Sequence, residues 1–175
     1  MAFNLDRFVD ACVAAAGGAD PVERVRQLLQ AALAETDLGA ALPASQEDET
    51  LLHASAKLTV YGLRLTPRIH YPPHDHRMVA VIGLYEGVET NSFYRREGSG
   101  LVKTALHDSR APEVFVLPAD TIHSVANPGR RHSRAIHVYL GPLTRIERSV
   151  WSSDGLQERP FDNAFYFSQA RVMGD

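Results

Sequence analysis

The stretch PPHDHRMVAVIGLYEG, residues 72–87, places His74 and His76 one residue apart in front of an apolar run. In an extended chain the side chains alternate between faces, so these two imidazoles project to one side and Asp75 to the other. Neutral imidazole nitrogens are good ligands for Zn, Cu, Fe and Ni. The stretch therefore predicts part of a metal site at the mouth of a buried strand.

A second segment, LPADTIHSVANPG, follows the strand-like run EVFVL and carries Pro118, His123 and Asn127 in the spacing PxxxxHxxxN. An HxH pair followed by this spacing resembles the two-part signature of the cupin superfamily, and the resemblance covers roughly residues 50–165. It implies that both parts lie on neighbouring strands of a small double-stranded β-helix. By the same resemblance, His74, His76 and His123 hold one metal ion inside the barrel.

The sequence departs from the usual cupin pattern at the acidic ligand. Most cupins carry a glutamate four or five residues after the second histidine of the pair, whereas Ala80 and Val81 occupy those positions here. Glu86 and Glu89 come too late in the strand and turn to replace it. We therefore expect three neutral histidines with open coordination positions, which leave room for chemistry at the metal.

A third segment, RAIHVYLGP, places His137 and Tyr139 on the same face of a strand as Ala135. Three histidines and this run resemble the thiol dioxygenases of the cysteine dioxygenase type, which carry the run Ser-x-His-x-Tyr. In this chain Ala135 takes the place of the serine. The resemblance implies that Tyr139 donates a hydrogen bond to bound dioxygen or substrate and that His137 fixes its hydroxyl. Without the family, the two residues could form a buried polar pair on a core strand.

Two features bear on the substrate. Bacterial relatives bind the substrate carboxylate through an arginine or glutamine, and the aligned position holds Glu49, which would repel a carboxylate. Arg64, on the strand face of Leu58 and Val60, and Arg95 in SFYRR are candidates for a replacement anion contact, although arginines at such positions are more often solvated. No cysteine lies near the tyrosine for a cross-link, so cysteine itself is a doubtful substrate.

The rest of the chain predicts an all-β cupin barrel, a double-stranded β-helix of the jelly-roll type, with two N-terminal α-helices. Residues 1–36 show helical spacing, with Asp20 as a cap and Pro21 in the first position of the second helix. Cys12 falls on the buried stripe of the first helix, which favours a core role. Residues 1–50 are expected to form the helices and a connector from Gly39 onward, and residues 51–175 the barrel. The helices are expected to cover one edge of it.

Short β-rich runs follow from about residue 50, separated by turn residues, and ten of them fit a sandwich or barrel. The expected strands are LLHAS, LTVYGLRL, MVAVIGLYEG, ETNSFYRR, LVKTALHD, EVFVLP, IHSVAN, RAIHVYLGP, RSVWSS and NAFYFS. The other histidines that the sequence scatters over strand ends and loops are expected to be ordinary surface or core residues; they are His53, His70, His107 and His132.

Composition narrows the class of protein. A length of 175 residues and a hydrophobic content of 45% suit one domain with a real core. A net charge of -3 with mixed signs offers no basic face, so nucleic acid and membrane are not expected partners. The single cysteine and the lack of a long apolar run favour a soluble cytoplasmic protein. Cupins are often dimers, and an exposed edge strand would offer a route to a homodimer.

The segments PPHDHRM, AVIGLYEG and NSFYRR together resemble a group of bacterial proteins described as predicted metal-dependent enzymes of the double-stranded β-helix superfamily. The sequence therefore predicts a mononuclear Fe(II) dioxygenase that acts on a small thiol or related small molecule with dioxygen. One alternative uses Zn, Mn or Ni as a Lewis acid for hydrolysis, isomerisation or decarboxylation. The other is a non-catalytic cupin that binds or senses a small molecule.

Overall fold

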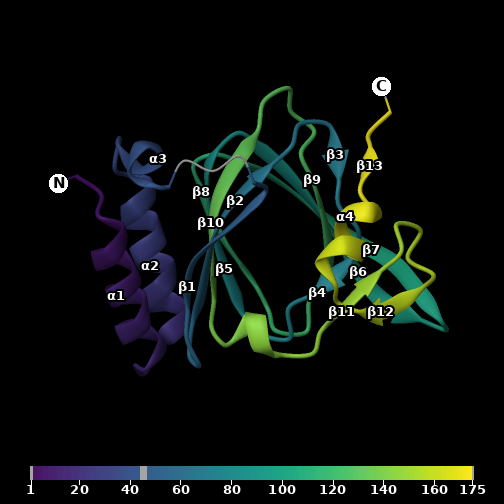
Figure 1. Cartoon of the computed structure of the whole chain (residues 1–175), viewed down its shortest axis with the longest axis horizontal. Coiled ribbons are helices and arrows are strands. Elements are labelled where there is room, and N and C mark those ends of the chain that lie inside the picture. The colour runs from purple at the N-terminus through teal and green to yellow at the C-terminus, as the bar shows by residue number, and fades with distance from the viewer. Residues whose placement is uncertain (1, 44–46, 175) are drawn as a thin grey trace.

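The computed structural model describes residues 2–43 and 47–174, and Figure 1 shows the N-terminal helices on one side of two facing β-sheets. The N-terminal helices are α1 (Leu5–Ala16), α2 (Pro21–Leu33) and the short α3 (Leu38–Ala41). No helix in the described part of the chain has both the length and the apolar composition that a membrane crossing requires.

The two predicted helices form, and their starts follow the expected chemistry. The side chain of Asn4 accepts a hydrogen bond from the backbone N–H of Arg7 at 2.8 Å, which caps α1. Asp20 caps α2 by accepting from the N–H of Glu23 at 3.3 Å, and Pro21 takes the first helical position. The Glu23 side chain binds Arg26, and it is Asp20 that caps the start of α2.

One antiparallel sheet has five strands in the order β1-β2-β10-β5-β8. Its strands are β1 (Glu49–Ala54), β2 (Thr59–Leu65), β5 (Ala80–Glu86), β8 (Glu113–Leu117) and β10 (Ser133–Tyr139). Alternate residues of β10 point to opposite faces, as the period of a strand requires. Ile136 and Val138 join the core beneath the helices, whereas Ala135 and Tyr139 belong to a separate cluster inside the barrel.

The other sheet has eight strands and lies across the barrel from the first (Figure 1). Its strands are β3 (Ile69–His70), β4 (His74–Asp75), β6 (Val88–Glu97), β7 (Gly100–Arg110), β9 (Ile122–Ala126), β11 (Ser149–Trp151), β12 (Glu158–Pro160) and β13 (Arg171–Val172). The path runs β12-β11-β4-β9-β3-β13, and β6 pairs with both β9 and β7. A 3-10 turn, η1 (Leu143–Arg145), connects the two sheets. The all-β prediction is confirmed.

The helices cover the outer face of the five-stranded sheet, so the prediction that they cover an edge is wrong. Leu29 of α2 is fully buried in the same cluster as Val81 and Ile136. Gly83 on β5 permits the close approach, because a Cβ there would lie 3.0 Å from side-chain atoms of both Leu29 and Leu33. An amphipathic helix buries more apolar area on a face than along an edge strand.

The run NAFYFS was expected to be a strand, but it forms the helix α4 (Asn163–Ser168). Aromatic residues favour strands in general, yet the side chain of Asp162 accepts a hydrogen bond from the N–H of Phe165 at 2.8 Å and starts a helix. Tyr166 then points inward and stacks on Tyr71, with ring centroids 5.8 Å apart. The expected connector from Gly39 onward begins inside α3 and ends at β1, and residues 44–46 lie outside the described residues.

Candidate metal centre

His74 and His123 lie directly opposite each other on the neighbouring strands β4 and β9. His76 follows two residues after His74, and one ligand atom from each ring lies within 4.8 Å of the others. The three ring centroids are 4.5 to 5.0 Å apart, and all three side chains are buried. The structure thus brings together the three histidines that the sequence singles out.

Asp75, which lies between His74 and His76, points its side chain away from the histidine group. This confirms the predicted alternation of side chains along the strand. The Asp75 carboxylate accepts a hydrogen bond from the N–H of Ser149 at 2.7 Å and lies 2.7 Å from Nε of Arg77. Through these contacts Asp75 binds the backbone of β11 and the turn after His76. It therefore lies outside the histidine group.

The outer nitrogens of two of the rings are fixed by the protein. Nδ1 of His74 lies 3.1 Å from the carbonyl oxygen of Pro72, and Nδ1 of His123 lies 2.9 Å from Oδ1 of Asn91. Metal-bound histidines usually donate the second ring N–H to such acceptors, which also sets the tautomer. Sequence reasoning missed Asn91, which belongs to β6 and meets β9 only through the sheet.

A metal ion fits this group by two independent observations. Nε2 of His123 is buried and has no hydrogen-bond partner in the described structure, and an unpartnered buried nitrogen is costly unless a ligand completes it. Burial lowers the pKa of all three rings, that of His123 to about 4, so the rings are neutral at pH 7 and their lone pairs are free. Imidazole nitrogens of this kind suit Fe, Zn, Cu or Ni.

Among the described residues, no carboxylate belongs to the histidine group. Ala80 and Val81 are fully buried apolar residues, and Val81 belongs to the core under the helices. Glu89 does line the same cavity, but its carboxylate accepts a hydrogen bond from Oγ of Ser133 at 2.7 Å and is not part of the metal group. Burial raises the pKa of Glu89 to about 7.

His137 and Tyr139 face the histidine group from β10, in the opposite sheet. Nδ1 of His137 lies 3.0 Å from Oη of Tyr139, and the Tyr139 ring centroid lies 4.9 Å from that of His76. Burial raises the pKa of Tyr139, and the nearby Glu49 adds to the effect, so the phenol keeps its proton. Burial lowers the pKa of His137 to about 3, which keeps its ring neutral.

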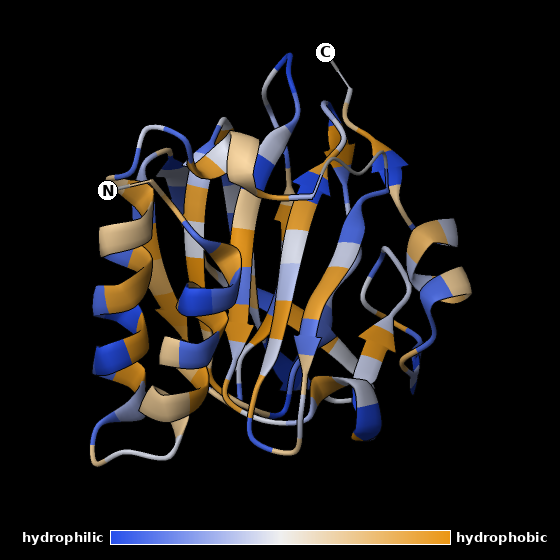
Figure 2. Cartoon of the chain, turned by 60° about the vertical axis from the view of Figure 1, so that its left-hand side comes forward, coloured by the Kyte–Doolittle hydropathy of each residue, from blue (hydrophilic) through white to orange (hydrophobic). Residues whose placement is uncertain are grey.

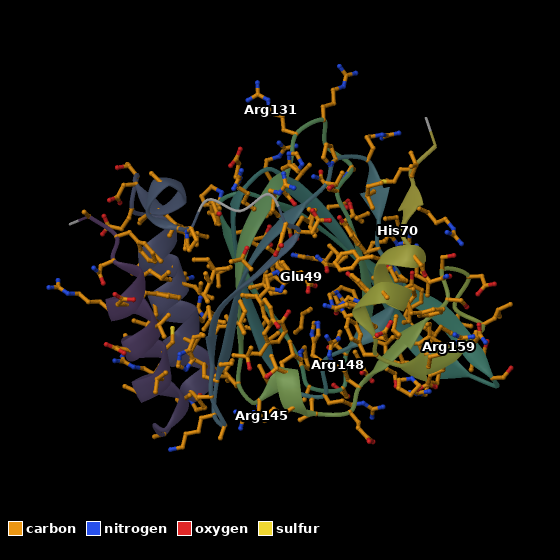
Figure 3. All side chains as sticks on the ribbon, viewed as in Figure 1. Glu49, His70, Arg131, Arg145, Arg148 and Arg159 are labelled. Atoms are coloured by element: carbon orange, nitrogen blue, oxygen red, sulfur yellow. The ribbon has the colours of Figure 1, made fainter. Side chains whose placement is uncertain are left out.

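A cavity that is partly open to solvent joins these groups. Glu49 and Arg148 also line it, and Figure 3 shows both side chains in the space between the two sheets. Arg148 places its guanidinium carbon 3.2 Å from the centroid of the Phe161 ring, and its Nη1 lies 3.4 Å from the carbonyl oxygen of Asp75. Sequence reasoning expected Arg148 only as the start of a strand.

The two arginines that the sequence offered as anion contacts lie elsewhere. Nη1 of Arg64 is 3.1 Å from Nε2 of His132, on the side of the sheet away from the histidine cavity. Arg95 is exposed and lies 2.6 Å from Glu97. The remaining histidines that the sequence set aside also stay outside the group; His70 contacts Ser124 at 2.8 Å and His107 contacts Glu113 at 2.8 Å. Cys12 is fully buried in the helix core, as expected, and burial raises the pKa of its thiol to about 12.

No protein family model matches the sequence. Among solved structures, a protein from Bacillus halodurans is 17% identical with a TM-score of 0.50, over 56% of this chain and 73% of that one. The cupin domain of Cnp3 from Schizosaccharomyces pombe is 10% identical with a TM-score of 0.48, over 58% and 66%. A single-residue variant of oxalate decarboxylase from Bacillus subtilis is 17% identical with a TM-score of 0.41, over 50% of this chain and 22% of that one.

These similarities concern the fold alone. The chain spans only 22% of the oxalate decarboxylase variant and 66% of the yeast cupin domain. The fold is an all-β barrel of two facing antiparallel sheets with helices at the N-terminus, as the sequence predicts.

Proposed function

We propose that this chain is a mononuclear non-haem iron enzyme that oxidises a small thiol with dioxygen. The observation that carries the proposal is the His137–Tyr139 pair, buried in one sheet and facing three neutral histidines of the other across one cavity. A buried phenol hydrogen-bonded to a neutral imidazole is suited to positioning a polar ligand. It adds little to stability that an apolar pair would not supply.

The three histidines would hold the ion through the ring nitrogens that the protein leaves without partners. Bound Fe(II) would supply redox chemistry and open positions for small ligands. Three neutral ligands leave more positive charge at the ion than a set with a carboxylate, which favours an anionic thiolate.

Tyr139 would act as a hydrogen-bond donor in this cavity. The raised pKa keeps its proton in place through the neutral range. In the His137 tautomer that carries the proton on Nδ1, the ring donates to the phenol oxygen, and the phenol O–H is then free to point at a ligand beside His76. Tyr61 packs edge-on against the Tyr139 ring at 6.3 Å and restricts its movement.

The overall reaction is balanced without another reductant. One thiol, R–SH, and one dioxygen give one sulfinic acid, R–SO₂H, in which both new S–O bonds take their oxygen from dioxygen. Sulfur loses four electrons and dioxygen accepts the same four. The thiol proton ends on the sulfinate or in solvent, so no oxidant beyond dioxygen is needed.

The test is anaerobic loading with Fe(II), followed by oxygen-electrode assays over a panel of small thiols. We expect thiol-dependent oxygen uptake, a sulfinate product by mass spectrometry, and a loss of kcat of about 100-fold for Tyr139→Phe, the size typical of one lost donor at a reacting centre. Tyr94→Phe is the matched control, because the Tyr94 hydroxyl contacts Ser124 at 3.0 Å and does not line the cavity.

Three results would overturn the proposal. Oxygen uptake that no thiol stimulates would remove the substrate class. Equal turnover by the Zn(II)-loaded protein would assign the site to Lewis-acid chemistry. Full activity of Tyr139→Phe would show that the phenol plays no part.

A further inference from the structure

Glu49 is a carboxylate in the cavity that makes no hydrogen bond or ion-pair contact with the described residues. The residue lies on β1, paired in register with Leu63, and both residues line the space in front of the histidines. Within residues 2–43 and 47–174, no hydrogen bond or ion pair to its carboxylate is present. A charged group in a largely enclosed space is costly unless it is paired, so a ligand is the natural partner.

The neighbouring acid shows how differently the protein treats a carboxylate that serves the fold. Asp48 accepts a hydrogen bond from the hydroxyl of Tyr71 at 2.6 Å and another from Thr66 at 3.3 Å, and Nη2 of Arg64 lies 3.8 Å away. All of these contacts anchor β1 to the rim of the barrel. Glu49, one residue further on, has none of them and points into the cavity (Figure 3).

Arg148 shares the cavity but does not neutralise Glu49 by contact. Its guanidinium lies over Phe161 and reaches the carbonyl of Asp75, and no ion pair with Glu49 forms within 4.0 Å. Burial raises the pKa of Glu49 while Arg148 opposes the rise. The cavity is therefore lined by one acidic and one basic side chain that form no ion pair with each other.

We propose that Glu49 is a cation subsite that makes the protein select ligands with a protonated amine. This inference rests on the proposed function and specifies its substrate class as aminothiols, with the sulfur toward the histidines and the ammonium at Glu49. A thiol that carries only a carboxylate meets repulsion from Glu49. A thiol with both charges also finds a partner for its carboxylate in Arg148.

The test compares three thiols of similar size that differ in charge: cysteamine, 2-mercaptoethanol and 3-mercaptopropionate. Binding to the Zn(II)-loaded protein under nitrogen is measured by isothermal titration calorimetry, so that no oxidation is required. We expect cysteamine to bind at least about 10-fold more tightly than 2-mercaptoethanol, the size of one charge-assisted hydrogen bond. Glu49→Gln should erase that preference by lowering the affinity for cysteamine by about 10-fold.

Glu97→Gln is the matched control, because it removes the same charge from an exposed residue that pairs with Arg95. Its preference for cysteamine should equal that of the unaltered protein. The inference is overturned if all three thiols bind equally, or if Glu49→Gln keeps the preference.

The binding measurement tests the Glu49 subsite, and the oxygen-uptake measurement tests the proposed function. A preference for cysteamine that depends on Glu49, without thiol-stimulated oxygen uptake, keeps the subsite and removes the oxygenase. Oxygen uptake with no preference among the thiols keeps the oxygenase and removes the subsite.

Discussion

The two faces of strand β10 serve opposite purposes. On the outer face Ile136 and Val138 are fully buried against the N-terminal helices, in a cluster made of apolar side chains. On the inner face His137 and Tyr139 are also buried, yet both are polar and point at the histidine group. Figure 2 shows the alternation of hydrophobic and hydrophilic residues along the strands.

The two faces contribute differently to the stability of this fold. Burial of apolar side chains on the outer face stabilises the sheet, since each fully buried side chain contributes about 1.5–3 kcal/mol. The inner face loses hydration of several polar groups and recovers only part of that cost through internal hydrogen bonds. The helical layer therefore stabilises a sheet whose other face carries buried polar side chains.

The largest effect is expected from a change on the inner side of the barrel. His123→Ala should lower metal affinity by at least about 1,000-fold, since an outer partner of a ligand alone is worth roughly 10–100-fold. Metal analysis after desalting and a competitive Zn(II) titration measure the loss. His107→Ala is the control, because that ring pairs with Glu113 outside the group. Retention of metal by His123→Ala would contradict the assigned centre.

A change on the outer face of the five-stranded sheet should lower stability and leave metal binding as it is. Leu29→Ala leaves a cavity under α2 and should lower the free energy of unfolding by about 3 kcal/mol. Urea denaturation followed by circular dichroism measures it. Metal content of the folded fraction should stay as it is in the unaltered protein. Loss of metal together with stability would show that the two faces are coupled.

A pH-dependent effect is expected from Glu89, which lies inside the barrel. Its pKa is about 7 in the folded protein against an ordinary value of 4.5, so the folded state binds more protons between those values. Stability should therefore fall as pH rises from about 4.5 to about 7, by about 3 kcal/mol at most, and stay lower above pH 7. Glu89→Gln should flatten this decline, which urea unfolding at pH 5 and pH 8 would detect. A parallel pH profile in the variant would refute the assignment.

Much of the fold and part of the site could be predicted from local patterns. Helical spacing and caps predict α1 and α2, and the HxH spacing with its alternation puts His74 and His76 on one face. The aromatic run 163–168 favours a strand but forms a helix, because the Asp162 cap and the burial of the Tyr166 ring outweigh the strand preference of aromatic residues. The sequence offers Arg64 as an anion contact from its strand face and Arg95 from its place in SFYRR, and neither feature says which side chains point into the cavity.

Asn91 and Arg148 show what local patterns omit. Each comes from a different strand or strand end, and each becomes part of the site only because two sheets close over one cavity. Nothing in the sequence around Asn91 marks it as the partner of His123, which lies 32 residues away. Pairing across a sheet brings such residues together.

The sequence by itself determined the chemistry of the donors: three histidines without an acidic ligand at the usual position, and an alternating His–Tyr pair on another strand. These properties follow from residue types and from a period of two, which are local. Only the tertiary structure decided which nitrogen of each ring is fixed, which carboxylate stays unpartnered, and which arginine enters the cavity. Those depend on distances between segments far apart in the chain, and such distances are set when the sheets pack.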